Sequence, residues 1–488
     1  MRKIPLLALL CALVFAVSVT AQQGVLQTAA ATLGVANIKT LQFTGAGRNF
    51  SVGQNYTASE PWPAVPVKSY TAAFNYDTAA MRIELLREMG PVMPRGGGAP
   101  FFGEQRQVQL VSGNYAWNAP AAPNGMAAPA PGAHAEWMLA LWATPQGFVK
   151  AAMASNAATR ATRGGTEVSF TVGGKYKLVG TINAQGHIEK VQTWFDQPIV
   201  GDMLVETTYT GYKDFGGVTF PSRIVQLQDG YPSLDITVSS VTANPMFDAP
   251  VPDNVRNAPP PAPQAVASQA LAAGVHYLTG GSHHSLAIEM KDHIVIVDLP
   301  LGEPRALAVV AKAKELIPNK PVRYVITSHH HWDHLSGIRT AIDEGATIVT
   351  HRSNKAFIER VAKTPHTLGP DTLASSKKSV KIQTVGDDGT LTDGTRVIRL
   401  HRVTGLEHTG DMLMVYLPAE KILAEADAYT APAQAGTALI PPAVPFARAL
   451  YDNIQRRKLD VQVIAPLHGN RTTDMAELGR SAGVNATN

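Results

Sequence analysis

The stretch HHHWDH, residues 329–334, contains four histidines and one aspartate, side chains of the types that bind metals, within six residues. It follows the apolar run Tyr324–Ile326 closely, and a buried run this short is typical of a parallel strand covered on both faces. Residues 335–342 then carry apolar side chains at helical spacing. The motif is therefore expected on a loop at the carboxyl end of a strand, where open α/β sheets place their functional residues.

In an extended loop, His329 and His331 point to the same side and can share one ion. Asp333 and His334, beside the start of the helix, are free to reach a second ion. The alternative interpretation is a solvated histidine-rich loop, but the chain has only 15 histidines in 488 residues, so chance rarely produces such a run. The motif predicts one half of a two-metal site.

The rest of the chain supplies further ligands beside predicted strands. His408 precedes the apolar run Leu413–Leu417, Asp427 ends the next apolar run, and His468 follows the run that begins at Val463. Each residue alone is more typical of a structural histidine or a turn aspartate. Together with residues 329–334 they complete a ligand set for two metals.

This order of residues resembles the metallo-β-lactamase superfamily over residues 273–488. The resemblance implies an αββα sandwich, a fold of the α+β or α/β class, with the metals at one edge. It also implies two Zn²⁺ ions per chain: a first zinc held by His329, His331 and His408, and a second held by Asp333, His334 and His468, with Asp427 bridging the two. Glu407 and Ala426 depart from the family pattern, which has glycine before the corresponding ligands.

The predicted chemistry follows from the metals. Coordination lowers the pKa of water to about 7, so a metal-bound hydroxide is expected to attack a carbonyl or phosphoryl group. Asp333 and Asp427 are the predicted catalytic residues, as ligands first and as proton carriers second. We expect a secreted dinuclear zinc hydrolase of esters, lactones or amides.

Three alternatives stay open at this point. The chain has one cysteine, Cys11, which excludes lactamases with a cysteine ligand but leaves a β-lactamase with histidine and aspartate ligands. The bridging Asp427 favours relatives similar to glyoxalase II or acyl homoserine lactonases. A mononuclear iron dioxygenase of the same fold, and a ligand-binding protein with a structural metal site, are the other two.

Three further residues are candidate substrate contacts. His283 and His284 lie at a glycine-rich bend, and Tyr429 follows Asp427 by two residues and could donate a hydrogen bond to an oxyanion. Exposed turn histidines and a packing role for Tyr429 are the alternatives. His330 is expected to point away from both metals.

Residues 1–21 combine Arg2 and Lys3 with an apolar run and small residues before Gln22, which predicts a secretory signal peptide. The alternative is a membrane anchor, for which the run is short. We expect a periplasmic or secreted protein without stable membrane insertion.

Residues 24–248 predict a separate domain rich in antiparallel strands. Alternating apolar and polar residues mark strands from Val168 to Val241, with turns at 183–186 and Asp229-Gly230, and residues 136–143 predict a helix. Residues 119–133, rich in proline and alanine, predict a flexible insertion. The pattern resembles the half-barrel of periplasmic lipoprotein carriers and shows no catalytic constellation. The proline-rich stretch 249–272 predicts a linker.

The charge balance bears on partners. The formal net charge is +4 without a basic stripe, so a nucleic-acid partner is not expected. The predicted partner is a small-molecule substrate, and homo-oligomerisation is left open.

Overall fold

The computed structural model describes residues 24–120, 125–262 and 264–484. The predicted signal peptide and Cys11 lie outside the described residues. Within these ranges no helix combines the length and the apolar composition of a membrane span.

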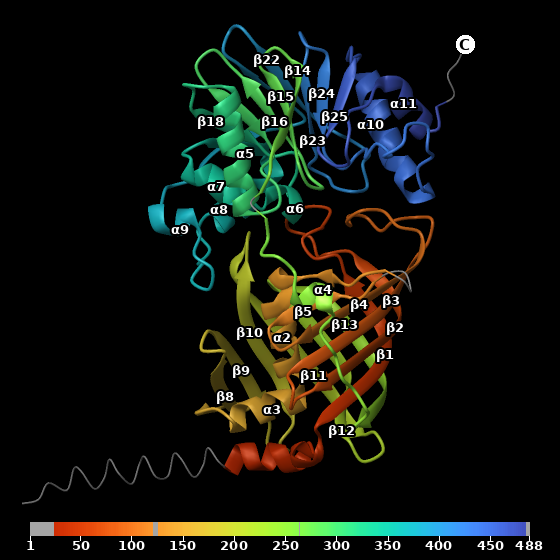
Figure 1. Cartoon of the computed structure of the whole chain (residues 1–488), viewed down its shortest axis with the longest axis vertical. Coiled ribbons are helices and arrows are strands. Elements are labelled where there is room, and N and C mark those ends of the chain that lie inside the picture. Colours follow the sequence, from red (N-terminus) through yellow and green to blue (C-terminus); the bar gives the residue numbers. More distant parts are fainter. Residues whose placement is uncertain (1–23, 121–124, 263, 485–488) are drawn as a thin grey trace, which may run out of the picture.

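A single curved sheet dominates the N-terminal half of the molecule (Figure 1). Every neighbouring pair of its thirteen strands is antiparallel. The order across the sheet is β6 (Ala128–Pro129), β5 (Tyr115–Asn118), β4 (Gly103–Ser112), β3 (Ala80–Met89), β2 (Ala64–Asn75), β1 (Thr40–Phe50), β13 (Tyr231–Ala243), β12 (Thr219–Gln228), β11 (Gly201–Asp214), β10 (Ile188–Gln197), β9 (Tyr176–Ile182), β8 (Gly165–Val172) and β7 (Ala158–Thr162).

The sheet curls around two helices, α2 (His134–Ala143) and α3 (Pro145–Met153). Helix α2 contacts β3, β4 and β5 on one flank and β10 on the other, which is why it lies inside the curve. Thr144 separates the two helices, and its hydroxyl caps α3 by accepting from the N–H of Gly147 at 3.2 Å, the preferred arrangement at a helix start. The helix predicted over 136–143 is confirmed.

The strands predicted between residues 168 and 241 are confirmed as β8 to β13. In β11 the side chains of Met203, Val205, Thr207 and Tyr209 are buried, while those of the residues that alternate with them are half-buried, which is the two-residue period of a strand. One prediction needs correction. Part of the proposed flexible insertion is ordered, because β6 pairs with β5 and residues Pro131–Ala133 form a 3-10 helix, η2.

The C-terminal half is a sandwich of two sheets with helices on both outer faces (Figure 1). The first sheet has the order β14 (Ala267–Ala272), β15 (Val275–Thr279), β16 (Ser285–Glu289), β17 (Ile294–Val297), β18 (Val322–Ile326), β19 (Thr347–His351) and β20 (Lys381–Val385). The second has the order β21 (Asp388–Thr392), β22 (Val397–Arg402), β23 (Leu413–Leu417), β24 (Ile422–Glu425) and β25 (Val463–Pro466).

The helices of this half flank the two sheets. They are α5 (Glu303–Leu316), α6 (Trp332–Leu335), α7 (Ile338–Asp343), α8 (Lys355–Val361), α9 (Thr372–Ser376), α10 (Val444–Arg456) and α11 (Met475–Ser481), with 3-10 turns η3 (Arg352–Asn354) and η4 (Pro441–Ala443). Strand β17 shows how the layers form. Val295 and Val297 face the core between the sheets, while Ile294 and Ile296 belong to the core that includes α5. The predicted αββα sandwich is confirmed.

The helical pattern of residues 335–342 is split into α6 and α7. Gly337 lies at the break, where its N–H donates to the carbonyl of Leu299 at 2.8 Å. A Cβ atom at this position would approach the Leu299 oxygen and the Ala306 side chain to 2.5 Å each. Close packing against α5 therefore interrupts one expected helix and makes two.

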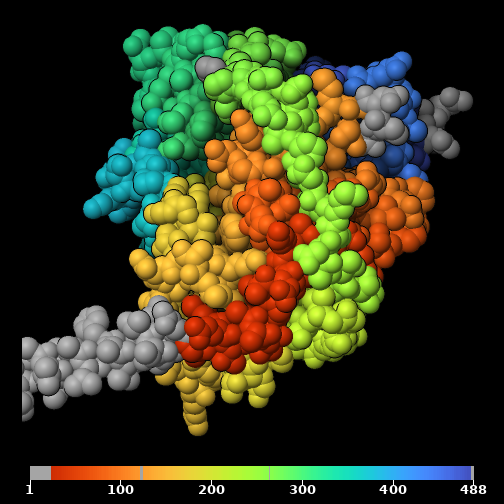
Figure 2. Space-filling view, turned by 60° about the horizontal axis from the view of Figure 1, so that its bottom comes forward, coloured from red at the N-terminus to blue at the C-terminus, as the bar shows by residue number. Residues whose placement is uncertain are grey.

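The connection between the halves includes α4 (Asp253–Arg256) and lies on the surface as the light-green segment of Figure 2. The halves also touch directly. The loop between β1 and β2 (residues 51–63, the β1–β2 loop) packs on α6, with the rings of Trp62 and Trp332 edge to face at 5.6 Å. At a second contact Arg360 makes two hydrogen bonds to Asp229, at 2.8 and 2.9 Å.

Candidate metal centre

Residues 329–334 leave the sheet at the end of β18 and are held there by Asp298. The buried Asp298 carboxylate accepts hydrogen bonds from the backbone N–H and the hydroxyl of Ser328, both at 2.6 Å, and lies 2.9 Å from Nδ1 of His334. Asp298 itself has a φ of +56°, a left-handed conformation that aspartate tolerates better than most residues. The aspartate at the end of β17 thus fixes the start of the loop and one candidate ligand.

The first candidate metal group contains His329, His331, His408 and Asp427. Their nearest donor atoms all lie within 4.8 Å of one another. Nε2 of His408 is 2.8 Å and Nε2 of His329 is 3.4 Å from Oδ2 of Asp427. The buried Nδ1 of His331 has no hydrogen-bond partner, although buried polar atoms nearly always have one. An unpaired nitrogen aimed into a histidine cluster is what a metal ligand requires.

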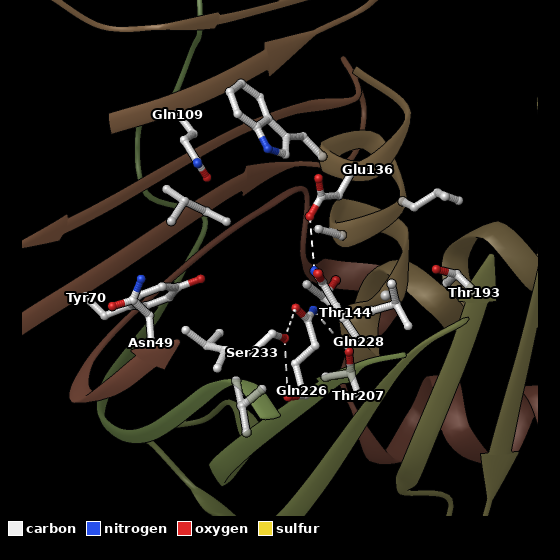
Figure 3. Close-up of a pocket in the computed structure, with 18 of the residues that line it drawn as sticks. Asn49, Tyr70, Gln109, Glu136, Thr144, Thr193, Thr207, Gln226, Gln228 and Ser233 are labelled. Carbon is white, nitrogen blue, oxygen red and sulfur yellow. Dashed lines mark hydrogen bonds between the residues drawn. The ribbon is translucent and has the colours of Figure 1, made fainter. Parts of the chain in front are cut away.

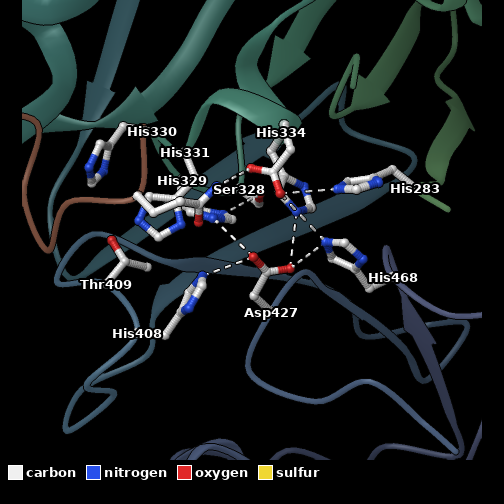
Figure 4. Close-up of polar contacts among 12 residues, drawn as sticks. His283, Ser328, His329, His330, His331, His334, His408, Thr409, Asp427 and His468 are labelled. Atoms are coloured by element: carbon white, nitrogen blue, oxygen red, sulfur yellow. Dashed lines mark hydrogen bonds and ion pairs between the residues drawn. The ribbon is translucent and has the colours of Figure 1, made fainter. Parts of the chain in front are cut away.

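The second candidate group contains His283, Asp333, His334 and His468, again within 4.8 Å. Oδ1 of Asp427 lies 3.0 Å from Nε2 of both His334 and His468. Figure 4 shows Asp427 between the two groups, with one oxygen directed toward each. The geometry therefore fits two adjacent cations with one shared carboxylate.

The electrostatics divide the ligands by protonation state. Burial lowers the pKa of His329 and His331, so these rings stay neutral and keep a lone pair for a metal. Burial alone would raise the pKa of Asp333 and Asp427, but the surrounding histidines outweigh it and hold both carboxyls below their usual range. Neutral imidazoles with ionised carboxylates are a donor set that suits zinc.

His334 behaves differently. Burial would lower its pKa, but Asp427 and Asp298 on either side raise the pKa well above the ordinary histidine value. A cation at the second group would replace the proton that His334 otherwise carries between these two carboxylates.

The remaining predicted residues are placed as follows. His284 lies outside both groups, with Nε2 2.6 Å from the carbonyl of Gly469. Tyr429 is buried, and its hydroxyl lies 3.0 Å from the Ser481 hydroxyl. The ring of His330 points away from both groups, with Nδ1 2.8 Å from Asp411. His283, in contrast, joins the second group.

Sequence reasoning missed several residues around the ligands. Asp298 and Asp411 each follow or precede an apolar strand by one or two positions, which is a weak signal for a supporting carboxylate. Gln54 and Asn55 belong to the β1–β2 loop of the other half of the molecule: Gln54 donates to Oδ1 of Asp333 at 2.9 Å, and the carbonyl of Asn55 is 2.8 Å from Nε2 of His331. No local pattern links them to residues 329–334.

Comparisons with known proteins agree with the geometry of this half. A family model described as the metallo-beta-lactamase superfamily matches residues 278–468. No curated protein matches the chain.

Solved structures also match. One is a metallo-beta-lactamase from Pontibacter korlensis, at 19% identity and a TM-score of 0.36, covering 45% of this chain and 98% of the other. Another is a metallo-beta-lactamase from Hirschia baltica, at 21% identity and a TM-score of 0.35, covering 45% and 97%. A third, from Pseudomonas aeruginosa in its mono-zinc form, has 18% identity and a TM-score of 0.34, covering 45% and 94%. Residues 278–468, which carry both candidate metal groups, form a metallo-beta-lactamase superfamily domain.

Proposed function

We propose that this protein is a hydrolase with two zinc ions per chain that cleaves an ester, lactone or amide bond of a small molecule. The observation that carries the proposal is the position of Asp427, which directs one oxygen toward each group of ligands. His329, His331 and His408 would hold the first ion. Asp333, His334 and His468 would hold the second.

Zinc ions held there would polarise a scissile carbonyl and lower the pKa of a water molecule to about 7. The chain supplies the rest. Asp298 orients His334, and Asp427 contacts histidines of both groups and so fixes their relative positions. Besides holding the ions, Asp333 and Asp427 would accept a proton from the attacking water and pass it to the leaving group.

The test uses the purified full-length protein, loaded with zinc and given an acyl lactone, a simple ester and a β-lactam in parallel. Acid release is followed in a pH-stat. His408→Ala should abolish turnover. His276→Ala, a histidine of β15 outside both groups, should leave it unchanged. Fewer than two bound metals per chain, or equal activity in the two variants, would reject the proposal.

The three substrates distinguish the remaining candidate functions. Lactone or ester turnover supports the favoured reading, and β-lactam turnover supports a lactamase. An iron-loaded protein that consumes oxygen with a thiol substrate but hydrolyses nothing would point to the dioxygenase alternative.

A cavity favours a second candidate function, the binding of an apolar ligand by the N-terminal half. Its volume is about 290 Å³, and it lies between α2 and the concave face of the sheet (Figure 3). Phe43, Phe74 and Trp137 contribute apolar surface, and Glu136 accepts a hydrogen bond from Gln228 at 3.1 Å. Binding of a fluorescent fatty acid, measured by its displacement, would test this function. Substitutions that widen or fill the cavity should weaken that binding.

We further propose that the protein acts outside the cytoplasm. The composition of residues 1–21 supports this localisation. Fractionation of the producing cell and mass spectrometry of the mature N-terminus would test it, with an uncleaved cytoplasmic protein as the contrary outcome.

A further inference from the structure

The metal ligands are not held by the C-terminal half alone. The β1–β2 loop lies between the loop of residues 329–334 and the loop that carries His408. The N–H of Trp332 donates to the carbonyl of Gly53 at 3.2 Å, and the N–H of Gly410 donates to the carbonyl of Tyr56 at 2.8 Å. The N-terminal half thus contacts both segments that supply the histidines of the first metal group.

Asn55 determines which nitrogen of His331 is available. A neutral imidazole has one N–H donor and one lone pair. Because Nε2 of His331 faces the carbonyl oxygen of Asn55 at 2.8 Å, and a carbonyl can only accept, Nε2 carries the hydrogen. The lone pair is therefore on Nδ1, the unpaired atom that points into the first group. A partner that fixes the tautomer of a ligating histidine is a recurrent support of metal sites.

Gln54 acts on the second group in the same way. Its amide Nε2 donates to Oδ1 of Asp333 at 2.9 Å, while Oδ2 faces Nε2 of His283 at 3.2 Å. The amide occupies one carboxylate oxygen and leaves the other for the cluster. The loop that carries Gln54 is itself fixed, since the N–H of Gly97 donates to the Gln54 carbonyl at 2.8 Å.

We propose that residues 53–56 of the β1–β2 loop are an integral part of the metal centre and that Gln54 and Asn55 are positioning residues for Asp333 and His331, respectively. Metal binding by the C-terminal domain then depends on the N-terminal domain. This inference rests on the proposed dinuclear function and gives the N-terminal half a role in it.

The loop can be perturbed at two points in the full-length protein. Gln54→Leu removes the amide donor at similar size. Gly53→Ala displaces the loop, because Gly53 has a φ of +75° and an added Cβ would come within 2.4 Å of the Trp332 ring. Thr57→Ala is the matched control, since the Thr57 hydroxyl forms its hydrogen bonds to Ser59 and Glu60 within the same loop.

Zinc affinity is measured by chelator competition, and the coordination geometry by the visible spectrum of the cobalt(II) form. Loss of such a supporting contact typically weakens metal affinity about 10- to 100-fold. We expect this loss for the second metal in Gln54→Leu and for both metals in Gly53→Ala, with altered cobalt spectra. Thr57→Ala should match the wild type.

The outcomes separate this inference from the proposed function. A wild-type protein that binds no metal would overturn both. A wild-type protein that binds two metals, with unchanged affinity and cobalt spectra in Gln54→Leu and Gly53→Ala, would overturn the inference alone. A folded variant with weakened metal binding supports it, and near-ultraviolet circular dichroism establishes the folding.

A different observation carries a second inference, on His283. Its Nε2 is 3.2 Å from Oδ2 of Asp333, and its Nδ1 is 2.8 Å from the Ser282 hydroxyl. The ring is buried, and its centroid lies 3.8 Å from that of His468. A backbone bridge pairs His283 with His468, and the N–H of His284 donates to the carbonyl of Leu467 at 2.8 Å. The backbone therefore holds His283 rigidly beside the ligands.

We infer that His283 is an additional ligand of the second metal, beyond Asp333, His334 and His468. His283 had been expected among the substrate contacts, and this inference assigns it to the metal instead.

His283→Gln tests the assignment, with His276→Gln as the control histidine. The second zinc should bind at least about 10-fold more weakly in His283→Gln, and the cobalt spectrum of that site should change while the first site is retained. Unchanged metal affinity and spectrum, with or without an effect on turnover, would overturn the assignment.

Discussion

Replacing Asp298 by asparagine should change the tautomer of His334 while leaving the packing around the ring unchanged. The carboxylate accepts from the N–H and hydroxyl of Ser328 and faces Nδ1 of His334. Asparagine has the same shape but one acceptor oxygen and one NH₂ donor. If the oxygen stays on the Ser328 N–H, the NH₂ group faces the hydroxyl, which can turn and accept, and Nδ1 of His334.

The histidine cannot turn in the same way. Facing a donor, Nδ1 must become the acceptor, and the hydrogen then moves to Nε2, the nitrogen that lies 3.0 Å from Asp427 and points into the second metal group. That nitrogen is no longer free for a metal. The expected loss of affinity at the second site is about 10- to 100-fold, or about 1.4 to 2.8 kcal/mol.

The assay is zinc titration of the full-length variant against a competing chelator, with metal counting by mass spectrometry. The first site should retain its affinity. Asp292→Asn is the control, since Asp292 is exposed and pairs with His293 and Arg323, away from both metal groups. Wild-type affinity at both sites in Asp298→Asn would refute the tautomer argument, and so would an equal loss in Asp292→Asn.

Three further outcomes are expected. Neighbouring carboxylates raise the pKa of His334 although burial opposes it, so zinc must displace a proton there. Zinc affinity at the second site should therefore fall as pH falls, more steeply than at the first site, and affinity titrations across neutral pH will show it. Arg339 is buried and makes two hydrogen bonds to Asp371, so Asp371→Ala should lower the unfolding free energy by about 3 to 5 kcal/mol in denaturant titrations. Burial raises the pKa of Glu136, so the contribution of this group to stability is present at acid pH and is lost as pH rises through the folded-state pKa. Compared with the wild type, Glu136→Gln should therefore be more stable at neutral pH than at acid pH, as thermal unfolding will measure.

The C-terminal fold could be predicted because local signals agree with the tertiary structure. Strand β18 ends in the buried residues Val325 and Ile326, the loop after it carries the motif, and the runs before Asp427 and His468 are strands of the second sheet. Ligands at the carboxyl ends of neighbouring strands meet at one edge of a sandwich. Spacing along the chain is therefore enough to bring them together in a prediction.

One of the first strands of the N-terminal sheet, β3, escaped prediction because its local preference misleads. Strand β3, AMRIELLREM, is composed largely of residues that favour helices. It is a strand because β2 and β4 pair with it along most of its length, and such pairing overrides weak intrinsic preference.

The contributions of Gln54 and Asn55 to the site could not be predicted for another reason. Gln54 and Asp333 are 279 positions apart in the sequence, and polar loop residues have no period that indicates a partner. Only the docking of the two halves brings them together.

The contact between Gly53 and Trp332 has a consequence for the evolution of chains that contain both domains. A side chain at position 53 would meet the Trp332 ring and a strained backbone at once, so a larger residue at position 53 requires a smaller residue at position 332 and a changed loop conformation. Where both domains are inherited together, these two positions should covary. In catalytic domains that occur without the sheet domain, the tryptophan should be free to drift, so the residue pair would mark the fused architecture in newly sequenced genomes.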